Sequence, residues 1–165
     1  MNGSLKVWLV ALLVLPLVAC ATTEWKYEKG AIQLHLVSDR NLNLFGGTAH
    51  TLLLCVYHLR DPNAFNQVQD EKDGLVKLLD CTRFDPSVTY AKKIIVQPGQ
   101  DVTEALDRAE GARYVAVVAG YSQLQKDRVT RFFEIPVGSL SKSPQRLDID
   151  LYLGPQEIQP SRGKP

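Results

Sequence analysis

Hydrophobic and polar residues follow short-period patterns along most of the chain, and these patterns predict β-strands. Residues 32–36 and 146–153 alternate, so one side of each strand should face a core and the other side solvent. Residues 52–59 and 114–121 are almost continuously hydrophobic, which is typical of strands buried on both faces. Weaker patterns predict further strands at residues 92–96 and 130–136. Six or seven short strands at irregular intervals favour a mainly β fold, an antiparallel β-sandwich.

A helical segment is expected between two of these strands. Leu75, Leu78 and Leu79 are spaced as one hydrophobic stripe of a helix, which predicts a helix at residues 71–80 with a separate turn at 64–68. A sandwich strand buries only one face, so this inserted segment should cover the outer face of residues 52–59.

The same arrangement brings two cysteines into reach of each other. Cys55 lies on the outer face of its expected strand, and Cys81 lies at the end of the expected helix. A disulfide between them would stabilise the domain by about 3 kcal/mol according to the chain-entropy model. Two buried free thiols are the alternative.

Residues 101–109 allow two interpretations. Asp101 and Glu104 resemble a helix capping box, and Gly111 could end a helix. Val102, Glu104 and Leu106 also alternate as in a strand. The local pattern leaves both open.

A loop is expected after the first strand, at residues 39–50. Asn41, Asn43, Gly46 and Gly47 are turn-forming residues, and they surround three hydrophobic residues, Leu42, Leu44 and Phe45. Those three could close the end of the core or form a binding loop. The residue pattern alone favours the first interpretation.

The N-terminus has the organisation of a secretory signal. Lys6 precedes an apolar run at residues 7–17, which is too short to span a membrane. Leu17-Val18-Ala19-Cys20 is similar to a bacterial lipobox, which implies cleavage before Cys20 and lipid on its thiol. An ordinary signal peptide is the alternative. We therefore divide the chain into a signal peptide (1–19), a lipidated tether (20–30), a β-sandwich domain (31–154) and a flexible tail (155–165).

The net charge and the absence of known motifs argue against nucleic-acid binding, metal binding and enzymatic activity. The formal net charge of +1 makes nucleic acid an improbable partner. The three histidines, His35, His50 and His58, lack metal-ligand spacing, so they are expected to be structural and no metal site is expected. No phosphate-binding, dinucleotide-binding or serine-hydrolase motif occurs. We therefore expect that the protein is not an enzyme and binds no cofactor.

Several segments together resemble TssJ, the outer-membrane lipoprotein family of the bacterial type VI secretion system. They occur in order along residues 17–140: the lipobox at Cys20, Leu42-Asn43 with Gly46-Gly47, residues 54–61, Phe65, the helix at 75–79, Gln97-Pro98-Gly99 and residues 112–121. The resemblance implies a transthyretin-like β-sandwich with an added helical element, and a strand at 102–106. It implies nothing about the cysteine pair.

The resemblance also implies a function. Members of the family anchor the secretion membrane complex by binding the periplasmic part of the inner-membrane protein TssM. The loop between the first two strands contributes to that contact, so the implied binding residues are Leu42, Asn43, Leu44, Phe45 and Gly46. This reverses the preference for a core-closing loop. A periplasmic carrier of a small apolar ligand, held between sheet and helix, is the alternative function, and an enzyme of transthyretin-like fold ranks last.

Overall fold

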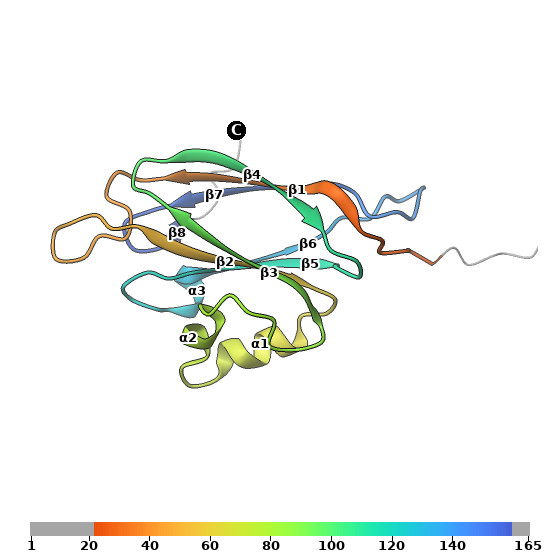
Figure 1. The fold of residues 1–165 in the computed structure, drawn as a ribbon, viewed down its shortest axis with the longest axis horizontal. Coiled ribbons are helices and arrows are strands. Elements are labelled where there is room, and N and C mark those ends of the chain that lie inside the picture. The colour runs from red at the N-terminus through yellow and green to blue at the C-terminus, as the bar shows by residue number, and fades with distance from the viewer. Residues whose placement is uncertain (1–21, 160–165) are drawn as a thin grey trace, which may run out of the picture.

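Two four-stranded sheets face each other and form a β-sandwich (Figure 1). The computed structural model describes residues 22–159, so the signal segment and Cys20 lie outside the described residues. The first sheet has the order β4 (Asp101–Arg108), β1 (Glu28–Ser38), β7 (Leu147–Leu153) and β8 (Ile158–Gln159). The second has the order β3 (Val88–Val96), β2 (Leu52–Leu59), β5 (Tyr114–Ala119) and β6 (Thr130–Glu134).

The mainly β sandwich predicted from the sequence is confirmed, with one difference in strand direction. β1 and β7 run parallel, in register from Ile32 opposite Leu147 to Ser38 opposite Leu153. The other neighbouring strands pair antiparallel. The sandwich is thus antiparallel, as expected, apart from this one pair. Alternation alone does not encode the direction of a strand, because the side-chain period is two in both cases.

The main core lies between the sheets and is built from every second residue of their strands. Ile32, Leu34 and Leu36 of β1 face Leu54 and Val56 of β2 in one cluster of buried side chains. A strand residue that points inward is separated by two positions from the next, which explains the alternation seen in the sequence.

A second core covers the outer face of β2. The inserted segment forms α1 (Asn63–Asp70) and α2 (Gly74–Leu78), which lie against the second sheet (Figure 1). Tyr57, Phe65 and Leu78 are buried here, and the Tyr57 hydroxyl donates to the Leu78 carbonyl. Full burial of one such hydrophobic side chain stabilises a protein by about 1.5–3 kcal/mol. A disulfide joins Cys55 to Cys81 and closes the segment onto the sheet.

The bounds of the helices differ from those expected. α1 occupies the place of the expected turn, and the expected helix at 71–80 shrinks to α2. Gly74 explains the interruption, because a Cβ atom there would lie 1.6 Å from the carbonyl oxygen of Val68. Asp73 precedes it with a left-handed φ of 60°. A short helix, α3 (Lys126–Val129), was not expected.

Other segments are more ordered than the sequence suggested. Residues 101–108 form strand β4, so the capping-box interpretation is wrong, since pairing with β1 outweighs local propensity. β1 begins at Glu28, and the Trp25 carbonyl already accepts a hydrogen bond from Gly111 N–H at 2.7 Å. The expected tether is therefore part of the domain from residue 25 onward. β8 pairs with β7 and buries Ile158, so residues 155–159 are not a flexible tail.

Candidate functional site

The two ends of the sandwich differ: one has the loop between β1 and β2, and the chain enters the domain at the other. The loops that follow β1, β3, β5 and β7 lie at one end. In the first sheet, β1 and β7 end there and β4 begins there. In the second sheet, β3 and β5 end beside the start of β2. The chain enters the domain at the opposite end, where β1 begins (Figure 1). The loop between β1 and β2, residues 39–51, projects from the first end.

The base of this loop belongs to the core. Leu42 has an exposed fraction of 0% and packs in the main core cluster. Its carbonyl accepts a hydrogen bond from the His50 N–H at 2.9 Å, which closes the loop at this level. The expectation that Leu42 lies outside the core is therefore wrong. Its position next to the ends of the strands lets it close the core, as the residue pattern alone had suggested.

Asn43 braces the loop through hydrogen bonds of its side chain. Its backbone has a left-handed φ of 45°, which asparagine tolerates better than most residues. Its side-chain nitrogen donates to the Thr51 carbonyl at 3.1 Å, and its side-chain oxygen accepts from the Ser122 N–H at 3.0 Å. Asn43 thus joins both arms of the loop to the neighbouring loop after β5. No motif or pattern in the sequence points to Ser122.

Leu44 fixes the loop from the other side. Its N–H donates to the Pro155 carbonyl at 2.7 Å, so the loop is also held by the turn between β7 and β8. The Leu44 side chain is half-buried. The sequence places Pro155 in the expected tail, so this contact is not predictable from it.

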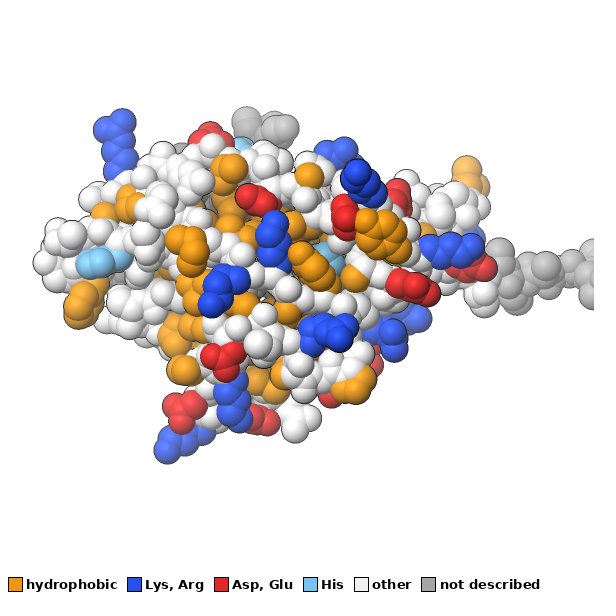
Figure 2. Space-filling model, in the orientation of Figure 1, with side chains coloured by type: hydrophobic (Ala, Val, Ile, Leu, Met, Phe, Trp, Pro, Cys, Tyr) orange, Lys and Arg blue, Asp and Glu red, His pale blue; other side chains and the backbone are white. Residues whose placement is uncertain are grey.

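The tip of the loop is a tight turn that exposes an aromatic ring. Phe45 and Thr48 exchange two backbone hydrogen bonds of 3.0 Å across Gly46 and Gly47. These glycines have φ values of 57° and 76°, the conformation that a two-residue hairpin turn requires. The Phe45 side chain is 67% exposed, and its ring centroid lies 6.4 Å from that of His50. Figure 2 shows a hydrophobic side chain beside a histidine at this end of the molecule. The loop can therefore present an apolar ring on a braced support.

The other two histidines have structural surroundings. His35 contacts Asp101 at 2.8 Å and Asp150 at 2.9 Å across three neighbouring strands, and hydrogen bonding to these carboxylates raises its pKa. His58 is fully buried beside Tyr90, and burial lowers its pKa to about 4. Between residues 22 and 159, no group of three or more His, Cys, Asp or Glu side chains is placed to hold a metal ion.

The space between the second sheet and the helices is filled by side chains. The ring of Tyr57 lies 5.8 Å from Phe65 and 5.8 Å from Phe84, centroid to centroid. The location that the carrier hypothesis assigned to a ligand is thus occupied by the protein's own core. In the described part of the chain, no helix has the length and hydropathy needed to cross a membrane.

Fold and loop together define a β-sandwich with a helical cover and a braced apolar loop at one end, and solved structures show the same fold. The lipoprotein TssJ1 of the type VI secretion system from Pseudomonas aeruginosa is 21% identical, with a TM-score of 0.60 over 85% of this chain and 98% of that chain. Serratia marcescens Lip, described as a membrane-bound component of that system, is 20% identical, with a TM-score of 0.64 over 81% and 98%. A chain of the structure described as the TssM C-terminal domain from EAEC is 12% identical, with a TM-score of 0.60 over 78% and 94%.

A family model described as type VI secretion lipoprotein (VasD, EvfM, TssJ) matches residues 30–154. The chain therefore belongs to the TssJ family of type VI secretion lipoproteins. No curated protein sequence is significantly similar to it.

Proposed function

We propose that this chain is an outer-membrane lipoprotein, acylated on Cys20, which anchors the type VI secretion membrane complex by binding the periplasmic part of the inner-membrane protein TssM. The contact is made by the tip of the loop between β1 and β2, with Phe45 at its centre and Leu44 beside it. The single observation that carries the proposal is the exposed Phe45 ring on a loop braced by its neighbours.

The geometry of β1 supports membrane attachment at one end of the domain and partner binding at the other. The strand has 11 residues, which corresponds to a length of about 36 Å at 3.3 Å per residue. Its first residue is close to Cys20 in sequence, and its last residue leads into the loop. An acylated Cys20 would therefore hold one end of the domain at the membrane, while the loop extends into the periplasm on the far side.

The brace around the loop favours binding by a preformed surface. Asn43 and Leu44 bond to segments that follow β5 and β7, so the loop loses little conformational freedom when a partner docks. An aromatic side chain buried at the centre of an interface can contribute 2 kcal/mol or more, roughly, to binding. The family relation, and the TssM named in the description of one similar structure, favour TssM as the partner.

A pulldown from envelope extracts tests the identity of the partner. The full chain, carrying a C-terminal affinity tag, should recover a large inner-membrane protein that mass spectrometry identifies as TssM. The variant Phe45→Ala should recover much less of it, while Phe132→Ala, which truncates an exposed phenylalanine on β6, should recover as much as the wild type. Equal recovery by all three proteins would contradict the role of the loop, and recovery of no inner-membrane protein would contradict the proposal.

Membrane attachment is tested separately by Cys20→Ala. Acyl chains hold a protein on a membrane without help from surface charge, and the net charge of this chain is only +1. The variant should be lost from the outer-membrane fraction after a salt wash. Variant protein that stays in that fraction would contradict acylation at Cys20 as the anchor.

A further inference from the structure

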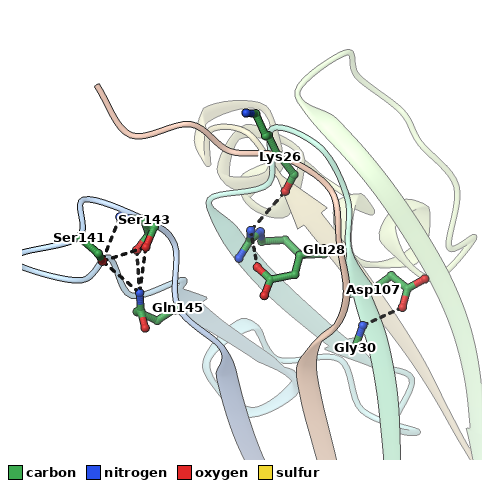
Figure 3. Close-up of polar contacts among 8 residues, drawn as sticks. Lys26, Glu28, Gly30, Asp107, Ser141, Ser143 and Gln145 are labelled. Atoms are coloured by element: carbon green, nitrogen blue, oxygen red, sulfur yellow. Dashed lines mark hydrogen bonds and ion pairs between the residues drawn. The ribbon is translucent and has the colours of Figure 1, made fainter. Parts of the chain in front are cut away.

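A pocket opens at the end of the domain where the chain enters from Cys20. It has a volume of about 530 Å³ and is lined on one side by Thr22, Glu28 and Arg108. The other side is formed by residues 141–144, which belong to the loop between β6 and β7. Figure 3 shows Lys26 and Glu28 on one side and Ser141 and Ser143 on the other, from segments far apart in the sequence.

Arg108 is the unusual side chain of this pocket. It is the last residue of β4 and follows Leu106 on the core-facing side of the strand, so the guanidinium group is drawn inward. Only 3% of the residue is exposed. One nitrogen, Nη2, donates to Glu28 at 2.8 Å and to the Lys26 carbonyl at 3.2 Å. The other two, Nε and Nη1, have no hydrogen-bond partner among residues 22–159.

A buried guanidinium group with unused donors calls for an acceptor. Arginine nitrogens always carry protons, and a buried donor without an acceptor destabilises a protein. The flat, fixed geometry of the group suits two oxygens of a phosphate. The carboxylate of Glu28 binds Nη2 and leaves Nε and Nη1 without an acceptor. Because both atoms are buried, the guanidinium group has to turn toward the pocket for them to meet a ligand oxygen.

The rest of the lining suits an anion. Lys26, Arg108 and Lys142 are the cations of the pocket, and Glu24 and Glu28 are its carboxylates, so one positive charge is in excess. Each carboxylate is paired: Glu24 with Lys26 at 2.5 Å and Glu28 with Arg108. The Ser141 hydroxyl accepts a hydrogen bond from the Ser143 hydroxyl at 2.8 Å, so its own proton is available to a ligand.

The position of the pocket points to the membrane as the source of the phosphate. Thr22 is two residues from Cys20, a distance of at most about 7 Å along the chain. Leu140 lies next to the pocket in the loop between β6 and β7 and is 97% exposed, and Figure 2 shows a hydrophobic side chain protruding at that end. Hydrophobic side chains combined with basic residues are what interfacial helices use to bind a membrane surface, and Leu140 and Lys142 provide the same combination here.

We propose that this pocket binds the phosphate of a phospholipid headgroup, with Arg108 as the main donor and Lys142 and Ser141 completing the site, while Leu140 enters the acyl region. This inference rests on the proposed acylation of Cys20, which puts this end of the domain at the membrane. The contact would fix the orientation of the domain, which a lipidated chain terminus alone does not do, and would hold the β1–β2 loop away from the bilayer.

The test is an NMR titration of the full chain purified from membranes in an uncharged detergent. The probes are dihexanoylphosphatidylglycerol, inorganic phosphate and dihexanoylglycerol, which lacks the phosphate. The phospholipid should shift the amide signals of residues 26–28 and 141–144 to saturation and should bind more tightly than either other probe.

Variants of the lining residues should lower the affinity for the phospholipid. Lys142→Ala and Ser141→Ala are surface changes that should weaken binding. Arg108→Gln should weaken binding at least about tenfold, as expected for loss of a charged hydrogen-bond donor. Lys72→Ala, an exposed lysine next to α2, is the matched control and should bind as the wild type does.

Each other outcome overturns the inference. Equal binding of inorganic phosphate would make this a site for free phosphate, and equal binding of dihexanoylglycerol would reduce it to an apolar contact. Unchanged affinity in both Lys142→Ala and Ser141→Ala would contradict the site even if Arg108→Gln does not fold. The titration needs no partner protein, and the mass of the purified chain reports acylation independently. A negative titration therefore leaves the proposed function standing.

Discussion

The side-chain oxygen of Asn43 accepts a hydrogen bond from the backbone N–H of Ser122 at 3.0 Å, although the two residues are 79 positions apart. The side-chain nitrogen of Asn43 donates to Thr51 at the same time. Replacement by alanine removes both bonds and strains a left-handed backbone, so we expect Asn43→Ala to lower the free energy of unfolding by about 2–3 kcal/mol. Asn43→Gly removes the same bonds without the strain and should cost about 1 kcal/mol less. Urea unfolding of both variants measures the difference, and equal losses would contradict the importance of the backbone conformation.

Leu42 and Phe45 are three positions apart but should respond in opposite ways to truncation. Leu42 is fully buried, so Leu42→Ala should lower the free energy of unfolding by about 2–5 kcal/mol. Phe45 is mostly exposed, and Phe45→Ala should change it by no more than about 0.5 kcal/mol. Chemical unfolding of the two variants under identical conditions checks the assignment. A Leu42→Ala variant as stable as the wild type would show that Leu42 does not close the core.

The disulfide should stabilise the helical cover. Cys55 and Cys81 are separated by 26 positions, and the chain-entropy model gives about 3 kcal/mol for a loop of this size. We expect the double variant Cys55→Ala, Cys81→Ala to lose about that amount of unfolding free energy. Its binding of the partner should be unchanged, because the pair lies against α2 and not in the β1–β2 loop. The wild type treated with a reducing agent serves as the comparison, and equal stability before and after reduction would contradict the expectation.

Acid should destabilise the fold through His58. Burial lowers the pKa of this histidine from 6.5 to about 4, so the unfolded chain takes up the proton first as the pH falls. Between these two pH values the contribution of His58 to stability should decrease by about 3 kcal/mol. His58→Phe keeps a buried ring without a titrating group, and its unfolding free energy should not show this decrease. Parallel pH dependence in the two proteins would contradict the assignment.

His35 should not interfere with that experiment. Its pKa is raised by Asp101 and then Asp150, so the stability it contributes is complete below pH 6.5 and is lost as the pH rises through the raised pKa. The two histidines therefore act in different pH ranges. In His35→Gln the loss on the alkaline side should be absent, and persistence of that loss would show that another group causes it.

The strands were predictable because a strand that is buried on one side has alternating hydrophobic and polar residues. This alternation occurs at Ile32 to Leu36 and at Leu147 to Leu153, and both segments are strands in adjacent positions of one sheet. The direction of β7 has no corresponding pattern in the sequence. The break between α1 and α2 depends on how closely Gly74 approaches Val68, a contact that no periodicity describes.

The loop was predicted in part, for a physical reason. Leu42, Leu44 and Phe45 are all hydrophobic. Hydrophobic character alone does not distinguish a residue that closes a core from one that binds a partner. The difference arises because the two arms of the loop are joined at Leu42 by the hydrogen bond from the His50 N–H to the Leu42 carbonyl. Leu42 therefore lies at the base of the loop and Phe45 at its tip. The braces through Ser122 and Pro155 come from segments that carry no motif. Lipidation of Cys20 stays a prediction.

The affinity for the partner of a Leu44→Ala, Phe45→Ala variant tests the central claim most directly. The purified wild type, this double variant and Phe132→Ala are titrated with the periplasmic part of TssM, and the melting temperature of each is measured on the same preparation. We predict that the double variant loses affinity by about 30-fold or more, the equivalent of about 2 kcal/mol, while its melting temperature changes by less than about 3 °C. Phe132→Ala should bind as the wild type does. Unchanged affinity of the double variant, at a melting temperature that shows it is folded, would contradict binding through this loop.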